Sequence, residues 1–252
     1  YGDNKMFEDI PTVSTKKQEI IDDLLKDLPS ESAIEVNLPS ENKIYALDDP
    51  GAPITLRPMT FEDEKQVISA DKNQDPVNII LQRCITNLHV GELLISDKLY
   101  LIMKLREISY GDDYTTTIVC NGCKTENNTT IKLSQLRIEP VPSDLCDPLE
   151  VHLPSIGKMV KVRIPRVKDE KLFGGGDIYT NLWRFVEEID GQFDKIIISA
   201  VLKKLPLRDM KLILKAMKTD FGVDTRIKFL CSECQETAVV ELPINANFFD
   251  AN

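Results

Sequence analysis

Apolar side chains recur at helical spacing in several separate stretches of the chain. The first stripe consists of Ile20, Ile21, Leu24, Leu25 and Leu28, and it predicts an amphipathic helix from about residue 15 to residue 28. A short acidic helix is expected after Thr60. Similar stripes predict helices at about residues 75–89, 96–108, 178–189, 194–205 and 207–221. Stripes of this kind are typical of helices that pack one face on a core.

Alternating apolar and polar residues mark short β-strands between these helices. The pattern predicts strands within residues 33–57 and at residues 114–119, 129–133, 149–153, 159–164, 224–230 and 237–242. Short antiparallel strands interspersed with helices predict an α+β fold.

Two of the predicted hairpins are joined by a Cys-x-x-Cys turn. Cys120 and Cys123 form the first turn, and Cys231 and Cys234 form the second. Four thiolates match the closed tetrahedral site of structural Zn²⁺, and soft sulfur ligands select zinc or iron–sulfur over hard cations. A lone Cys-x-x-Cys can instead be a redox dithiol. The polar spacers on strand turns favour a metal site here.

Residues 124–230 separate the two turns, a far longer interval than in an ordinary zinc ribbon. Either each pair serves its own site, or two distant parts of the chain meet over one ion. Residues 35–40 resemble residues 150–155, and residues 97–102 resemble residues 209–214, at offsets close to that between the two turns. This repetition favours the second alternative.

We therefore predict an internally duplicated fold. Each half is expected to be a small antiparallel β element plus helices, ending in one zinc knuckle, and the two knuckles join in one zinc-ribbon-like site. The predicted divisions are an N-terminal segment at 1–30, a first half at 31–145 and a second half at 146–252.

The charge balance narrows the class of partner. The chain has 31 basic and 41 acidic residues, for a net charge of −10. Affinity for nucleic acids comes largely from Lys and Arg, so this balance argues against a protein that neutralises many phosphates. No run of about 18 apolar residues predicts a membrane span. Six cysteines without a recognisable signal peptide indicate a reducing compartment.

No catalytic set emerges from the sequence. His89 and His152 are the only histidines, and neither has the spacing of a catalytic or metal-binding motif. A zinc ion held by four cysteines has no open position for water, so its role would be structural. We therefore predict no catalytic residues, no small-molecule substrate and no cofactor other than structural zinc.

Two stretches carry distinctive motifs. One is residues 105–112, with an Arg-Glu-Ile-Ser-Tyr-Gly run, together with the first Cys-x-x-Cys turn. The other runs from residues 205–209 through the second turn to the terminal Phe248-Phe249 pair. Together these stretches resemble the baseplate-hub assembly proteins of T-even-like contractile-tailed bacteriophages. The Arg-Glu-Ile-Ser-Tyr-Gly run and the C-terminal knuckle are the most specific parts, and the resemblance extends over roughly residues 30–252.

This resemblance implies a non-enzymatic protein that helps to build the central hub of the tail baseplate in the host cell cytoplasm. Other hub proteins are then its expected partners. Whether the protein stays in the tail baseplate of the virion is left open. The alternative is a zinc-ribbon nucleic-acid-binding or transcription factor, which the knuckles alone support. The net charge and the scarcity of interleaved arginine and aromatic residues count against that alternative.

Two apolar features near the chain ends are candidates for partner binding. Leu24 and Leu25 lie on the predicted N-terminal helix, and such helices dock through anchors at this spacing. Phe248 and Phe249 form an aromatic pair, and aromatic residues carry much interface energy. The helix either packs on its own domain or docks on a partner, and the same two alternatives hold for the aromatic pair.

Overall fold

The computed structural model describes residues 15–26, 33–45, 53–68, 75–173, 178–244 and 246–249. The chain divides into two compact units, Tyr1–Ser32 and Ala33–Asn252. The first unit contains helix α1 (Thr15–Leu25), and residues 27–28 of the predicted helix lie outside the described residues. Among the described helices, none has both the length and the apolar character needed to cross a bilayer.

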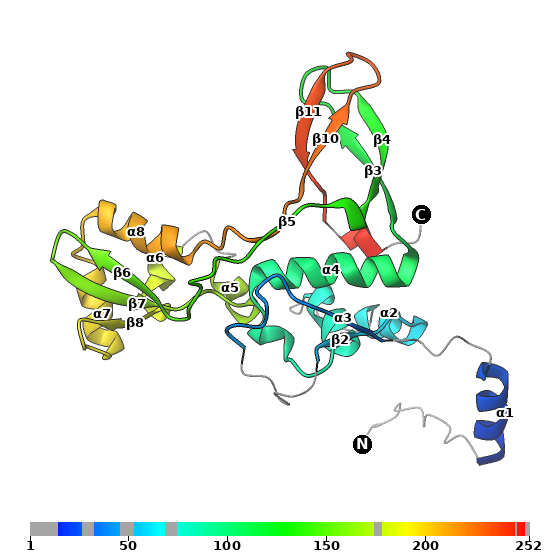
Figure 1. Ribbon diagram of the computed structural model, residues 1–252, viewed down its shortest axis with the longest axis horizontal. Helices are drawn as coiled ribbons and strands as arrows, with labels where there is room; N and C mark the ends of the chain where they lie inside the picture. The colour runs from blue at the N-terminus through cyan, green and yellow to red at the C-terminus, as the bar shows by residue number, and fades with distance from the viewer. Residues whose placement is uncertain are drawn as a thin grey trace, which may run out of the picture. The chain divides into compact units, whose positions relative to one another are not determined.

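The second unit combines short helices with short antiparallel strands, which confirms the predicted α+β class (Figure 1). Its helices are α2 (Phe61–Ile68), α3 (Pro76–Cys84), α4 (Ile95–Tyr110), α5 (Glu170–Phe173), α6 (Ile178–Asn181), α7 (Lys195–Leu202) and α8 (Leu207–Met217). Its strands are β1 (Ile34–Glu35), β2 (Thr55–Leu56), β3 (Asp113–Val119), β4 (Glu126–Lys132), β5 (Ile138–Glu139), β6 (Leu149–Leu153), β7 (Lys158–Val162), β8 (Val186–Ile189), β9 (Gly222–Val223), β10 (Arg226–Leu230) and β11 (Thr237–Glu241).

Sheets in the described residues are small. The strands pair as β1–β2, β3–β4, β5–β9 and β10–β11, and β6, β7 and β8 form a three-stranded sheet in that order. All of these pairings are antiparallel. Sheets this small are marginal alone, so their stability comes from the helices and cores that they pack against.

Hairpins β3–β4 and β10–β11 carry the two Cys-x-x-Cys turns and stand side by side near α4 (Figure 1). Alternate residues of these strands are buried, including Tyr114, Ile118, Ile227 and Phe229. They join one hydrophobic cluster with the buried face of α4. The two Cys-x-x-Cys turns therefore extend from the main core, on hairpins that are far apart in the sequence.

Two further clusters lie in the second unit. One packs β6, β7 and β8 against α7 and α8. A smaller one joins Leu94, Val141, Ile164 and Phe221. The main cluster contains Val167 and Phe229 as well as residues of the first half, so the two predicted halves share a core.

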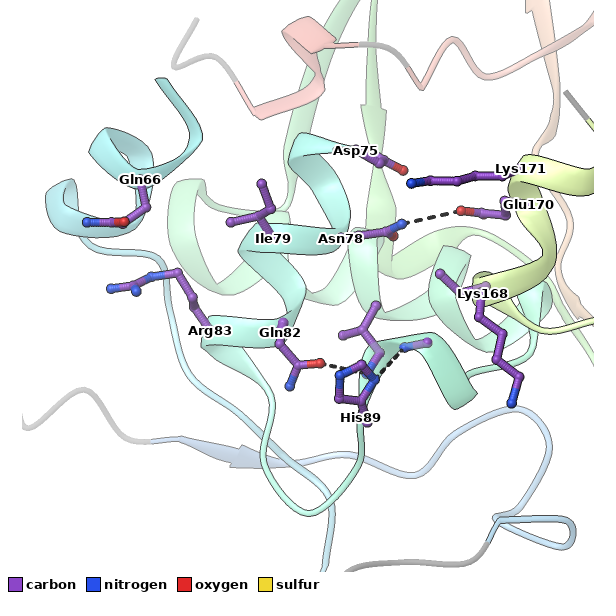
Figure 2. A pocket seen from close by; sticks show the side chains of 13 residues that line it. Gln66, Asp75, Asn78, Ile79, Gln82, Arg83, His89, Lys168, Glu170 and Lys171 are labelled. Atoms are coloured by element: carbon purple, nitrogen blue, oxygen red, sulfur yellow. Dashed lines mark hydrogen bonds between the residues drawn. The ribbon is translucent and has the colours of Figure 1, made fainter. Parts of the chain in front are cut away.

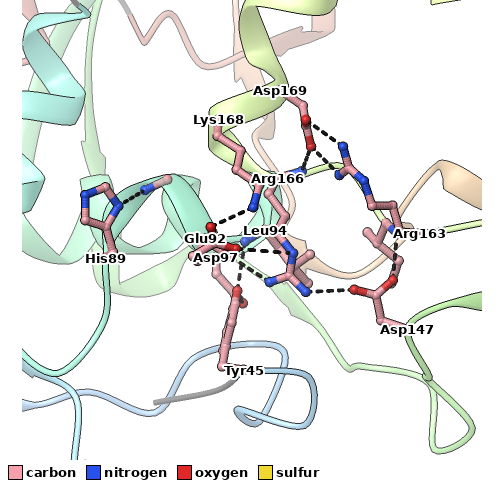
Figure 3. A network of polar contacts seen from close by, with 12 residues as sticks. Tyr45, His89, Glu92, Leu94, Asp97, Asp147, Arg163, Arg166, Lys168 and Asp169 are labelled. Atoms are coloured by element: carbon pink, nitrogen blue, oxygen red, sulfur yellow. Dashed lines mark hydrogen bonds and ion pairs between the residues drawn. The ribbon is translucent and has the colours of Figure 1, made fainter. Parts of the chain in front are cut away.

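A polar network also joins the two halves (Figure 3). Arg166 donates to the Glu92 carbonyl and to the Asp147 carboxylate, at 2.7 Å in each case. Asp147 also accepts from the Ile164 backbone N–H at 2.9 Å, and Lys168 reaches the Glu92 carboxylate at 2.6 Å. Buried charges are stable only when paired and hydrogen-bonded. This network therefore fixes how the segment after β7 lies against the segment before α4.

The two halves contain matching strand connections. Hairpin β1–β2 leads into Arg57, whose N–H donates to the Cys84 carbonyl at 2.9 Å. Hairpin β6–β7 leads into Arg163, whose N–H donates to the Phe185 carbonyl at 2.9 Å. In each half, the backbone that follows the second strand of the hairpin is therefore hydrogen-bonded to a segment later in the chain.

The same two arginines hold matching aspartates. Arg57 donates two hydrogen bonds to Asp63, at 2.7 and 2.9 Å, and Arg163 donates two to Asp169, at 2.6 and 2.8 Å. The backbone N–H three residues before each aspartate donates to the same carboxylate at 2.9 Å. Thr60 and Asp63 thereby form a capping box at the start of α2.

A third correspondence links each hairpin to a later helix. The Ser40 N–H donates to Asp97 at 3.0 Å, and the Ser155 N–H donates to Asp209 at 3.2 Å. Both aspartates are fully buried, and they are the third residues of α4 and α8. Anionic side chains in the first helical turn interact favourably with the helix dipole.

Three predicted helices differ from the observed elements. The helix predicted at about residues 75–89 ends at Cys84, and Ile85 forms a β-bridge with Leu56 of β2. Residues 178–189 form α6, a 3₁₀ turn at Leu182–Arg184 and then β8. Strand β7 offers β8 a partner, and this tertiary pairing overrides the helical spacing of its apolar residues. The last helix ends at Met217, not near Phe221, and Gly222 belongs to β9, where it pairs with Glu139 of β5.

Candidate metal centre

The two Cys-x-x-Cys turns have the same backbone structure. The N–H of the first cysteine donates to the carbonyl five residues on, at 2.9 Å in the first turn and 3.0 Å in the second. Its own carbonyl accepts from the N–H four residues on, at 3.0 and 3.1 Å. Lys124 and Gln235, at equivalent positions, have positive φ angles of 64° and 59°. Each turn therefore presents its cysteines in the same way.

The four cysteine sulfurs converge between the hairpins. The Sγ atoms of Cys120, Cys123, Cys231 and Cys234 all lie within 4.8 Å of one another. Cys120 Sγ is 3.7 Å from Cys234 Sγ, and Cys123 Sγ is 3.5 Å from Cys231 Sγ. A tetrahedral site with metal–sulfur bonds of about 2.3 Å has sulfur–sulfur edges of about 3.8 Å. The cluster therefore has the dimensions needed to hold one metal ion.

Two of these thiols are predisposed to ionise. Thr125, whose Oγ1 lies 3.3 Å from Cys123 Sγ, lowers the pKa of Cys123 to about 6 through its hydroxyl and its backbone N–H. Backbone N–H groups of Cys234 and Glu233 lower the pKa of Cys231. Metal ligands must be thiolates, so these hydrogen bonds favour the form that binds a metal ion.

The pKa of a further thiol, Cys234, reflects how close the four sulfurs lie to one another. The Glu236 N–H favours the thiolate of Cys234, but burial and the neighbouring thiols raise its pKa to about 12. Four sulfurs this close cannot all carry negative charge without a compensating cation. A divalent ion bound at the centre of the cluster would supply that charge.

Asn127 on β4 supports the site from outside the cluster. Its side-chain N–H₂ donates to Cys231 Sγ at 3.6 Å and to the Thr125 carbonyl at 2.9 Å. Its oxygen accepts from the Ser232 N–H at 2.8 Å and from the Ser232 hydroxyl at 2.9 Å. This buried side chain of one hairpin therefore orients the turn of the other. Sequence motifs missed it, although asparagine in a strand is uncommon enough to be a signal.

The predicted partner-binding residues lie in very different surroundings. Leu24 and Leu25 of α1 are 75% and 50% exposed. Phe248 is fully buried, and its ring lies 4.8 Å from that of Tyr114 and 5.5 Å from that of Phe249. Of the two alternatives for the aromatic pair, the structure therefore has the one in which it packs on its own domain. Binding of a partner through Phe248 and Phe249 stays a prediction.

A separate pocket of about 760 Å³ lies between α3 and the segment that leads into α5 (Figure 2). Lys98 binds its two carboxylates, Asp75 at 3.0 Å and Glu170 at 2.9 Å. His89 accepts from the Gly91 N–H at 3.1 Å. Lys98 therefore links the two segments, and His89 caps the 3₁₀ turn Val90–Glu92. Cys84 is buried in the main core, and Cys146 is exposed.

Comparison with protein families finds a match to the model described as T4 bacteriophage base plate protein, over residues 31–250. Searches against curated proteins and against solved structures produced no match. The matched region spans nearly all of the second unit, including both Cys-x-x-Cys turns and the aromatic pair. The chain therefore belongs to the T4 bacteriophage base plate protein family.

Proposed function

We propose that this protein is a non-enzymatic assembly factor or structural subunit of the bacteriophage tail baseplate hub. The family match over residues 31–250 carries this proposal. The protein would act on other hub proteins in the host cell cytoplasm during assembly, and a place in the tail baseplate of the virion is consistent with the family. A centre whose ligands are all cysteines holds a fold together, which suits a scaffold that binds proteins.

The proposed metal is one zinc ion per chain, held by Cys120, Cys123, Cys231 and Cys234. The support is a set of four sulfurs with tetrahedral spacing, together with backbone and Asn127 hydrogen bonds to them. Four thiolates complete the coordination of zinc, so its contribution is to join hairpin β3–β4 to hairpin β10–β11.

We also propose that the two halves arose by duplication. Three kinds of contact support it: the added strand after each hairpin, the Arg57–Asp63 and Arg163–Asp169 pairs, and the serine contacts to Asp97 and Asp209. A crystal structure of the metal-bound protein should superpose residues 33–133 on residues 149–242 about a pseudo-two-fold axis through the metal. Unrelated strand orders in the two halves would contradict the duplication.

Helix α1 is the proposed contact to a hub protein. Its leucines are exposed within a helix that has charged residues on its other side. Co-expression of the tagged chain with the hub proteins of the same phage should yield a captured partner. Leu24→Asp combined with Leu25→Asp should reduce this capture at least tenfold, because a carboxylate cannot enter an apolar groove unpaired.

The matched control is Glu19→Lys with Asp22→Lys, which changes charge on the opposite side of α1. This variant should retain capture, and both variants should keep the metal content of the wild type. Equal capture by the leucine variant would remove α1 from the interface. Substrate turnover, or tight nucleic-acid binding at physiological salt, would contradict the proposed function itself.

A further inference from the structure

Helix α7 is apolar on nearly all sides. Its residues are Lys-Ile-Ile-Ile-Ser-Ala-Val-Leu, and only Ile198 and Leu202 are buried in the cluster formed with the sheet β6–β7–β8. A surface helix normally has one apolar face and one polar face, and a helix that is apolar all round is normally covered on all sides. The apolar face of α7 that points away from this cluster is therefore expected to be covered by a partner.

The outer face of α7 forms a continuous patch. Phe193, Ile196 and Ile197 are 64%, 82% and 44% exposed. Ile196, Ile197 and the exposed Ala200 lie on one side of α7, because residues three or four apart share a helix face, and Phe193 directly precedes the N-cap residue Asp194. Single exposed apolar residues are ordinary on protein surfaces, whereas contiguous patches mark interaction sites.

A groove adjoins this patch. It has a volume of about 510 Å³ and runs between α6, α7 and the start of α8, where Tyr179, Trp183, Lys203 and Leu207 line it. Tyr179 is 53% exposed and Leu207 is 71% exposed. Tyrosine and tryptophan are enriched among the residues that dominate binding energy. The groove therefore offers anchoring pockets beside the apolar patch.

The charges around this surface are basic, although the whole chain is acidic. Lys203 and Lys204 directly follow α7, and Arg208 and Lys211 lie on α8; all four are exposed. Among the described residues, no ion pair involves Lys203, Lys204 or Lys211. Asp194 caps α7 by accepting from the Ile196 N–H at 2.7 Å, and Asp209 is buried. The rim therefore presents positive charge to whatever covers the patch.

We propose that the outer face of α7 and the adjoining groove are the docking surface for an acidic amphipathic segment of another baseplate protein. Apolar side chains of that segment cover Phe193, Ile196 and Ile197, and its carboxylates pair with Lys203 and Lys204. A second copy of this chain fits less well, because symmetric pairing of the patch brings the lysines of the two copies together. The inference rests on the proposed function and assigns it a surface separate from α1.

The test uses the full tagged chain co-expressed with the hub proteins of the same phage. Ile196→Glu with Ile197→Glu should lower capture of the partner at least tenfold, and Lys203→Glu with Lys204→Glu should lower it as well. The matched control is Val239→Glu on β11, an apolar residue that is 53% exposed, and it should retain capture. Unchanged melting temperature and metal content show that each variant is folded.

Zero-length carbodiimide cross-linking of the wild-type complex identifies the occupant, because it joins lysine amines to carboxylates in contact. The expected product links Lys203 or Lys204 to an aspartate or glutamate of a hub protein. Links to a second copy of this chain, or undiminished capture by both α7 variants, would overturn the inference while the proposed function stands. If the wild-type chain captures no hub protein, the proposed function fails first.

Discussion

Replacing Cys231 with serine is expected to abolish metal binding and to lower the melting temperature by on the order of 20 °C or more. Cys231 is fully buried and belongs to the same hydrophobic cluster as α4. A structural zinc site is worth on the order of 10 kcal/mol of apparent folding free energy. Losing it frees hairpin β10–β11 from hairpin β3–β4, and the shared core beneath them loses one side.

Two controls separate the metal from the cysteine itself. Cys146→Ser changes an exposed thiol outside the cluster, and it should leave both zinc content and melting temperature unchanged. A chelator added to the wild type should reproduce the melting temperature of Cys231→Ser. Elemental analysis should find one zinc ion per wild-type chain. Two zinc ions per chain, or a Cys231→Ser protein that melts within a few degrees of the wild type, would contradict a structural site shared by both turns.

The cysteine cluster could be predicted because each Cys-x-x-Cys motif lies within four residues and contains the ligand type that suits a metal ion. Each Cys-x-x-Cys turn is recognisable from a few residues, and internal repetition was enough to suggest that distant turns meet. The position of Asn127 could not be predicted in the same way. Its role depends on Ser232 and Cys231, which lie on the other hairpin, and such contacts exist only after the two hairpins come together.

The aromatic pair shows why the ends of a chain are difficult to interpret from sequence. Exposed aromatic residues and buried ones have the same local pattern. Whether the rings are buried depends on whether residues from another part of the chain pack against them. Here Tyr114 and Arg106 provide it, with the Arg106 guanidinium 5.7 Å from the Phe248 ring and 5.0 Å from the Tyr114 ring. Arg106 lies on α4, far from Phe248 in sequence.

Strand β8 illustrates a different limit. Ile178, Leu182, Phe185, Val186 and Ile189 fit a helical stripe, and periodicity alone cannot separate a short buried strand from a helix. The strand depends on its pairing with β7, in which Val162 pairs with Val186 and Val160 pairs with Ile189. A similar contact occurs in residues 31–145, where Leu56 is bridged to Ile85.

Asp63→Asn is expected to cost about 3 kcal/mol of unfolding free energy at neutral pH, the scale seen when one partner of a buried ion pair is removed. The Asp63 carboxylate is fully buried and accepts from Arg57, from Arg83 at 2.6 Å and from the Thr60 N–H at 2.9 Å. The amide of asparagine has the same shape but carries no charge, so both guanidiniums lose their counter-ion. The neighbouring variant Glu62→Gln is the control, because that side chain is mostly exposed and its contact to Lys65 is 3.4 Å long.

The pH dependence of this difference gives the sharper test. The Arg57 guanidinium foremost, with the Thr60 N–H and Arg83, holds the pKa of Asp63 well below its usual range. A depressed carboxyl pKa contributes stability that is complete above the unfolded value of about 3.9 and is lost as the pH falls toward the folded value. Denaturant unfolding of wild type and Asp63→Asn at several pH values should therefore show a constant gap above about pH 5 that narrows below about pH 4. Comparison of the two proteins at each pH cancels the acid sensitivity of the cysteine site, which both share. A gap that stays constant down to pH 3, or that is already absent at pH 7, would show that the ionised Asp63 does not hold Arg57 and Arg83 against α2.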